Sequence, residues 1–267
     1  MSTTVDPTFA ATVASSRPAR LGRYSLWLFR DYVMNQGPST ILVVALLAYL
    51  TIAPAKAMLA MNAHGPQTLH EMPALMRAQM LRNLLGTFVF LATLFATNGL
   101  ISNDKKLGYY RFLFAKPVSA PAYYATAFAT NGLGVMLVAG ILFATWCSIT
   151  GWVWFPWLFP MIALMYLAYG GIAFLLSAIT RFDWLSLVTV LFAANIVWDL
   201  WGENATGWRW LVQRLLPPAN KTAAVYSFAT SHFAQADWKA MLWLAGYGAL
   251  CLAIGLLWLR KRPLAAA

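Results

Sequence analysis

Apolar runs close to the roughly 20 residues that a helix needs to span a lipid bilayer recur along most of this chain. Hydrocarbon offers the backbone no hydrogen-bond partners, so such runs cross membranes as helices. Of the 267 residues, 61% are apolar and 10% are charged, against roughly 25% charged residues in soluble domains. We therefore expect an all-α integral membrane protein with one membrane domain over residues 19–267, after a polar, disordered tail over residues 1–18.

The apolar runs predict six transmembrane helices. The expected spans cover residues 39–61, 83–102, 124–150, 157–179, 185–200 and 240–259. Prolines and charged side chains interrupt residues 62–80, which we expect to form an exposed connection. The short turn between the third and fourth spans carries Trp152, Trp154 and Trp157, which are typical of the aromatic belt at a membrane interface.

Two other segments are too polar to cross hydrocarbon and too aromatic for a solvated loop. Residues 21–34 alternate aromatic and apolar side chains with charged ones, which favours an amino-terminal amphipathic helix in the membrane interface. A cytoplasmic extension of the first span is the alternative. Glycine, proline and charged residues break up residues 201–228, where we expect one or two short re-entrant or interfacial helices between spans five and six.

Basic residues predict the orientation of the chain. Its 19 Lys and Arg residues divide twelve to seven between the two sides, and the richer side holds both termini. Because cytoplasmic connections carry the excess of positive charge, we expect a multi-pass protein of the cytoplasmic (inner) membrane with both termini in the cytoplasm. The net charge of +11 is scattered in short clusters, so we expect membrane lipid and no nucleic acid as a partner.

Motifs for catalysis are missing from the sequence. It has no G-x-S-x-G elbow, H-E-x-x-H pair or paired C-x-x-C, and its three histidines are widely spaced. We therefore expect no catalytic residues, no metal site and no cofactor on this chain, and an intramembrane enzyme lacks a candidate nucleophile and base. The predicted spans carry Asn98, Asn131 and Asn195. Each is expected to form a helix-to-helix hydrogen bond, or else to line a transport pathway or interface.

The stretch between the second and third spans is the most informative part of the sequence. Residues 101–124 read ISNDKKLGYYRFLFAKPVSAPAYY, with five large apolar or aromatic side chains within residues 109–114. A solvated loop does not need them, so we expect a short cytoplasmic surface helix with an apolar face, ended by Pro117. That face either binds a partner or lies on lipid headgroups.

This stretch resembles the signature of the ABC type-2 exporter permeases, in which an acidic and a basic residue precede a glycine and a Pro-Val-Ser triplet closes the segment. The matching positions are Asp104, Lys105, Gly108, Leu113, Phe114, Pro117, Val118 and Ser119. The sequence departs from the pattern at Arg111, where Glu is usual, at Ala120, where Arg is frequent, and at Phe128, roughly where Lys is common.

The resemblance implies a permease subunit of an ATP-driven transporter. Its coupling helix would lie between spans two and three and dock on a separate ATPase subunit. The chain has no G-x-x-x-x-G-K-[ST] loop, so ATP and Mg would be bound by that partner. Docking is expected to use Asp104, Lys105, Gly108, Tyr110, Phe112, Leu113, Phe114, Pro117 and Val118.

A second permease, identical or related, would complete the transporter, with spans two and five at the interface. The aromatic and largely uncharged spans suggest an amphipathic or lipid-like substrate. The alternative from another class is a non-transporting membrane anchor or assembly factor, which recruits a soluble partner through the same surface helix.

Overall fold

The computed structural model describes residues 25–61, 71–97, 100–101, 104, 119–180, 184–202, 206–218, 221–222, 225 and 237–261. All regular structure within these ranges is helical. Four helices are long and apolar enough to cross a membrane: α4 (Ala74–Thr97), α7 (Ala120–Thr150), α8 (Leu158–Ile179) and α12 (Trp238–Lys261). A bent pair at the amino-terminal end raises the number to five. The tail predicted at residues 1–18 lies outside the described ranges.

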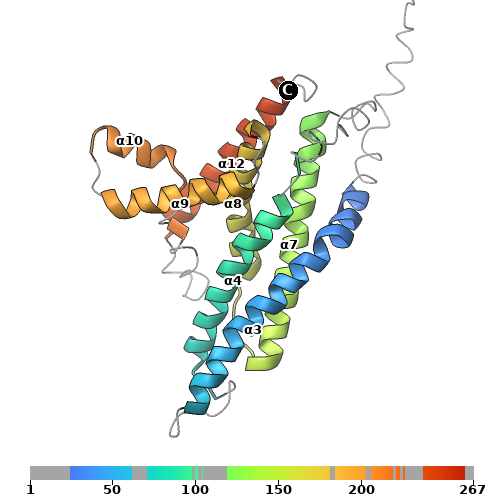
Figure 1. The fold of residues 1–267 in the computed structure, drawn as a ribbon, viewed down its shortest axis with the longest axis vertical. Coiled ribbons are helices and arrows are strands. Elements are labelled where there is room, and N and C mark those ends of the chain that lie inside the picture. The colour runs from blue at the N-terminus through green and yellow to red at the C-terminus, as the bar shows by residue number, and fades with distance from the viewer. Residues whose placement is uncertain are drawn as a thin grey trace, which may run out of the picture.

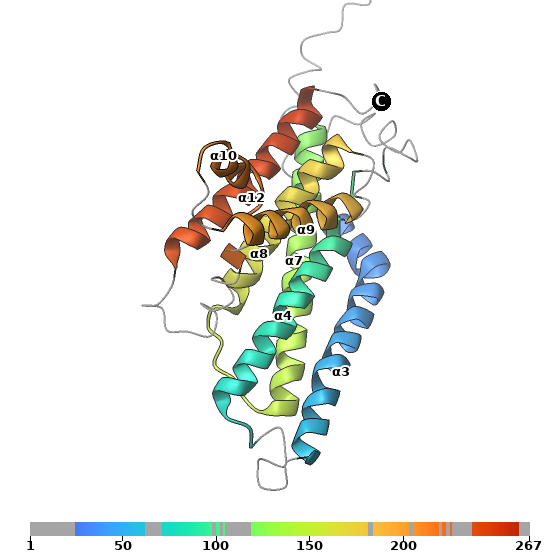
Figure 2. The same cartoon turned by 60° about the vertical axis from the view of Figure 1, so that its left-hand side comes forward.

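The long helices form one bundle (Figures 1 and 2). Helices α3 (Gly37–Met61) and α7 both pack against α4, and α8 packs against α4, α7 and α12. The core contains large apolar side chains from several helices, among them Phe88, Leu142 and Met165, each fully buried. Because aromatic and aliphatic residues surround most of each helix, the bundle also exposes many large apolar side chains, which is expected of a surface that faces lipid.

The amino-terminal helix is continuous with α3 but bent. Segments Ser25–Met34 and Gly37–Ala53 meet at 50°, and the π-helical turn η1 (Tyr32–Gln36) lies at the bend. There the Gly37 N–H donates to the Tyr32 carbonyl, five residues back, and Pro38 has no N–H to continue the α-helical pattern. Both features bend helices. The bend explains why an interfacial helix and an extension of span one were both compatible with the sequence.

Helix α4 begins earlier than the sequence analysis predicted. We expected an exposed connection as far as residue 80, but α4 starts at Ala74, directly after Pro73. The Pro73 carbonyl accepts hydrogen bonds from the N–H groups of Met76 and Arg77. The prediction was wrong because Arg77 was treated as a loop residue. Its guanidinium instead donates to the Thr150 carbonyl at the end of α7, where a helix favours a cation.

Helices α8 and α12 cross with their backbones in contact. A Cβ atom on Gly171 would lie 2.9 Å from the Gly248 carbonyl carbon, and one on Gly248 would lie 2.8 Å from the Ala168 Cα. At Gly255, further along α12, the close neighbour is a side chain instead: an added Cβ would lie 2.7 Å from the Phe174 ring. Small residues allow such close approach, and in a membrane van der Waals contact is a main source of helix association.

Helix α9 (Trp184–Trp201) matches the bounds of the predicted fifth span but not its direction. It runs across the bundle instead of along it, and α10 (Trp208–Leu215) doubles back beside it (Figures 1 and 2). Two hydrogen bonds hold this arrangement: the Gln213 side chain donates to the Gly202 carbonyl at 2.8 Å, and the Trp198 indole donates to the Pro217 carbonyl at 3.3 Å. One short helix predicted after span five is therefore present as α10.

Candidate functional site

The structure describes only part of the predicted docking segment. Asp104 is described, and Ser119, which closes the motif, is the residue before the first turn of α7. The other docking residues and Asn98 lie outside the described ranges: Lys105, Gly108, Tyr110, Phe112, Leu113, Phe114, Pro117 and Val118. The described part of the site is thus the two places where this segment meets the bundle.

Asp104 is attached to the start of α7. The Tyr124 hydroxyl donates to the Asp104 carboxylate at 3.0 Å. Burial raises the pKa of Asp104 above its ordinary value because a charged carboxylate loses hydration, and the Tyr124 hydrogen bond opposes this effect. The carboxylate is partly buried and bonded to α7, so Asp104 tethers the start of the docking segment to that helix.

A second polar contact ties the end of α4 to α7. The Asn131 amide, on a side chain only 6% exposed, donates to the Ala96 carbonyl at 2.6 Å. Ala96 lies in the last turn of α4, where carbonyls have no partner within the helix. The predicted helix-to-helix hydrogen bond of Asn131 is confirmed. Since Tyr124 and Asn131 are seven residues apart on α7, both tethers lie on one face of that helix.

Phe128 lies between the two tethers and explains one departure from the permease pattern. Its ring packs against Gly170 of α8, where an added Cβ would be 2.9 Å from the ring, and its carbonyl accepts a 2.8 Å hydrogen bond from the Tyr166 hydroxyl. Phe174 meets the ring edge-on, with centroids 5.9 Å apart. A lysine could not fill this apolar contact without burying its charge.

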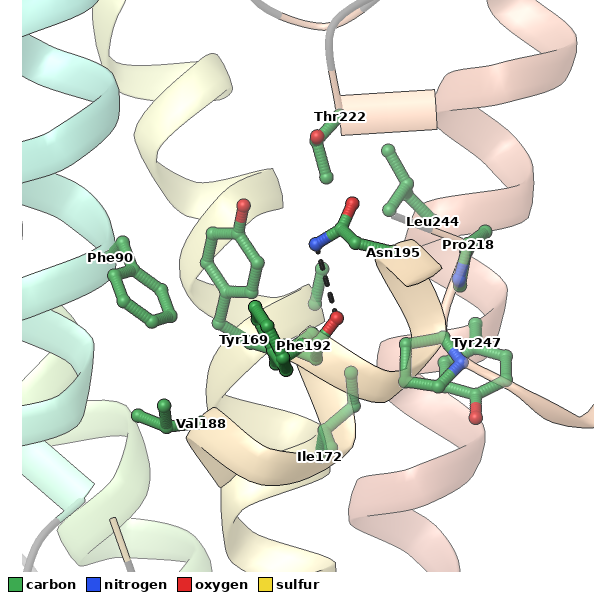
Figure 3. Close-up of a pocket in the computed structure, with 13 residues that line it drawn as sticks. Phe90, Tyr169, Ile172, Val188, Phe192, Asn195, Pro218, Thr222, Leu244 and Tyr247 are labelled. Carbon is green, nitrogen blue, oxygen red and sulfur yellow. Dashed lines mark hydrogen bonds between the residues drawn. The ribbon is translucent and has the colours of Figure 1, made fainter. Parts of the chain in front are cut away.

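A separate cavity of about 320 Å³ lies between the crossing helix α9 and the bundle (Figure 3). Its lining comes from α4, α8, α9, α12 and the chain after α10, and aromatic and aliphatic side chains predominate. Phe192 lines it while remaining 67% exposed, so the cavity opens at the surface. Its size is at the lower end of the roughly 300–1,000 Å³ typical of small-molecule sites.

Three of the polar groups that line this cavity lie toward one end, whereas the Tyr247 hydroxyl points the other way (Figure 3). Asn195, Thr222 and the Tyr169 hydroxyl lie at the same end in Figure 3, with Val188 and Ile172 at the other. The Asn195 amide donates to the Leu191 carbonyl of its own helix at 3.1 Å, and its predicted helix-to-helix bond stays a prediction. Its side chain lines the cavity.

Sequence reasoning missed Tyr169, Tyr247 and Gln213 as structural polar groups. Tyr247 lines the cavity and donates from its hydroxyl to the Leu215 carbonyl at 2.8 Å, joining α12 to the end of α10. The available signal was a hydroxyl or amide within an aromatic helix, which requires a partner when buried. The sequence could not identify that partner, because it lies 32 residues away.

The described residues include no group of three or more His, Cys, Asp or Glu side chains that could hold a metal ion. No protein-family model matches this chain, and neither a curated protein nor a solved structure matches it.

Proposed function

We propose that this chain is the membrane-spanning permease subunit of an ATP-binding-cassette exporter of the type-2 family, in the cytoplasmic membrane with both termini in the cytoplasm. The observation that carries the proposal is the spacing of Asp104, Lys105, Gly108 and the Pro117–Val118–Ser119 triplet in the connection between two apolar helices. A connection of 22 residues with this composition, between α4 and α7, has the length and the apolar content for a docking helix.

The two tethers support the proposal by their position. A partner that binds residues 105–118 and moves them transmits the movement to Asp104 at one end of the segment and to Ser119 at the other end. Asp104 is bonded to Tyr124 of α7, and the end of α4 is bonded to Asn131 of the same helix. Movement of the segment would therefore be transmitted to α4 and α7 together, which is what a coupling element must do.

The partners follow from the same proposal. A separate ATPase subunit binds ATP and Mg, and its closure drives the segment as a lever. A second permease, identical or related, completes the pathway, and the substrate is amphipathic or lipid-like. The chain itself performs no chemistry and works as an enzyme only through the partner ATPase.

Affinity purification in mild detergent tests this function. We expect an ATPase to co-purify with the intact chain and ATP hydrolysis to be measurable in the preparation. A chain carrying Leu113→Asp and Phe114→Asp should lose the ATPase, because two carboxylates would have to be desolvated in an apolar contact.

The matched control is Leu75→Asp. Leu75 is 75% exposed in the first turn of α4, at the end of that helix remote from the docking segment, and this variant should retain the ATPase. Gel filtration shows whether each variant is folded. If no ATPase appears with the parent chain in several detergents, or if the double variant keeps it, the transporter proposal fails.

One observation favours the second candidate, a membrane anchor or assembly factor. The permease family implies six spans, whereas α9 lies across the bundle and the described residues contain four long apolar helices, or five with the bent pair. An anchor needs no alternating pathway and no sixth span. In that case, the same purification would yield a soluble partner without ATP hydrolysis, and the Leu113 and Phe114 substitutions would release it.

A further inference from the structure

The cavity beside α9 has the polarity of a site for an amphipathic molecule. Its apolar end contains Val188 and Ile172, and its polar end contains Asn195 and Thr222 (Figure 3). The opening beside Phe192 lies on an apolar helix face. A molecule that enters from the membrane can thus place a hydrocarbon chain against the apolar end without desolvating a charge.

A cation on α10 lies near this cavity, although its side chain does not line it. The Arg214 guanidinium carbon is 4.8 Å from the ring centroid of Trp243 and 5.3 Å from that of Trp210. Its neighbour Leu215 accepts the hydrogen bond from Tyr247, a cavity-lining residue one turn after Trp243 on α12. Arg214 is thus one residue from a group that is bonded to the cavity lining, on the α10 and α12 side.

The Arg214 side chain is arranged to receive an anion. Contact with aromatic rings occupies the faces of a guanidinium and leaves its in-plane N–H donors available. Among the residues that the structure describes, no carboxylate pairs with Arg214, and α10 itself contains no acidic residue. A phosphate group matches the remaining donors in both charge and geometry.

We propose that this cavity binds one anionic phospholipid, with part of an acyl chain in the apolar end and the phosphate at Arg214. Free phosphate would leave the apolar lining empty, and a neutral lipid would leave Arg214 without a net negative partner. The phospholipid satisfies both parts at once. The site does not depend on the transporter proposal, since an anchor with the same fold would bind the same lipid.

Native mass spectrometry of the purified full chain in mild detergent tests the site. The chain is titrated with dioleoylphosphatidylglycerol or with dioleoylphosphatidylcholine, which have the same acyl chains. We expect preferential retention of one phosphatidylglycerol. Arg214→Gln should weaken it about tenfold, the effect of one charge-assisted hydrogen bond, and Val188→Trp should abolish it by filling the apolar end.

Two controls use similar positions outside the cavity. Arg209→Gln removes an arginine from the same helix, one whose guanidinium carbon lies 5.9 Å from the Trp208 ring centroid. Ile196→Trp adds the same bulk to α9 at a residue 41% exposed that does not line the cavity. Both should bind phosphatidylglycerol like the parent chain.

Several outcomes would overturn the proposal. Equal retention of the two lipids would show that charge is not recognised, and equal losses in Arg214→Gln and Arg209→Gln would show a diffuse basic surface. Unchanged binding in Val188→Trp would place the acyl chain elsewhere. If the mass spectrum shows a dimer without bound lipid, a second copy of the chain occupies the cavity. Gel filtration of each variant excludes misfolding as the cause of a loss.

Discussion

The backbones of α8 and α12 are in contact at Gly248. Replacing this glycine with alanine adds one carbon atom at the contact and therefore tests the fold directly. An alanine Cβ at Gly248 would lie 2.8 Å from the Ala168 Cα, whereas carbon atoms in contact are about 3.5–4.0 Å apart. The obstacle is backbone, which cannot rotate away as a side chain can. The two helices must therefore separate locally by about 1 Å, and they lose dispersion energy along the crossing.

The expected cost can be compared with a control on the same helix. Overpacking of this kind destabilises proteins by about 1–3 kcal/mol. A Cβ at Gly246 would meet nothing within 4 Å, so Gly246→Ala should gain up to about 1 kcal/mol from helix propensity. Gly248→Ala gains the same helix propensity, so the difference between the two variants is the overpacking cost alone, about 2 kcal/mol.

Thermal unfolding in detergent, followed by circular dichroism at one scan rate, measures this difference. For a chain of this size, about 2 kcal/mol corresponds to roughly 4–8 °C between the two midpoints. Gly171→Ala should lower the midpoint as Gly248→Ala does. The double variant should cost less than the sum of the two, because both substitutions disrupt one contact. Equal midpoints for Gly248→Ala and Gly246→Ala would show that the helices do not touch at this crossing.

Two further predictions concern the tethers on α7. Asn131→Ala should lower the unfolding free energy by about 1–3 kcal/mol, because the Ala96 carbonyl is left buried without a donor. The control is Asn195→Ala, whose amide bonds to a carbonyl of its own helix and which should cost less than about 0.5 kcal/mol. Equal losses in the two variants would contradict the tether. Burial raises the pKa of Asp104 in the folded state, so the folded chain binds this proton more tightly than the unfolded chain. That contribution is fully present below the ordinary carboxyl pKa and is lost as pH rises through the folded value. Asp104→Asn, which keeps an acceptor for Tyr124, should flatten the decline of the unfolding midpoint with rising pH, and a steeper decline in the variant would refute the assignment.

Helix positions were predictable because they depend on local composition. The predicted spans at 157–179 and 240–259 lie within two residues of α8 and α12 at both ends. The turn between α7 and α8 was also predicted correctly: Gly151 has φ of +87°, which favours glycine, and Trp152 and Trp154 are exposed. Long apolar runs specify helices irrespective of what they pack against.

Charged residues near helix ends were less predictable. Arg77 appeared to belong to a loop because its charge interrupts an apolar run, but Thr150 supplies an acceptor 73 residues away. A hydrocarbon stem with a charged tip can extend along a helix until its tip reaches a partner. The sequence contains both residues but does not indicate that they meet.

The sequence by itself determined the class of this protein, because the free energy of placing a run of residues in hydrocarbon is a sum over that run. It also determined the bounds of most helices, the short turn at Gly151 and the spacing of the docking motif. The tertiary structure decided the direction of α9, the glycine crossing of α8 and α12, and the cavity between α9 and the bundle. These depend on which surfaces are complementary across long separations in the chain, and contacts of that kind are absent from any local pattern of residues.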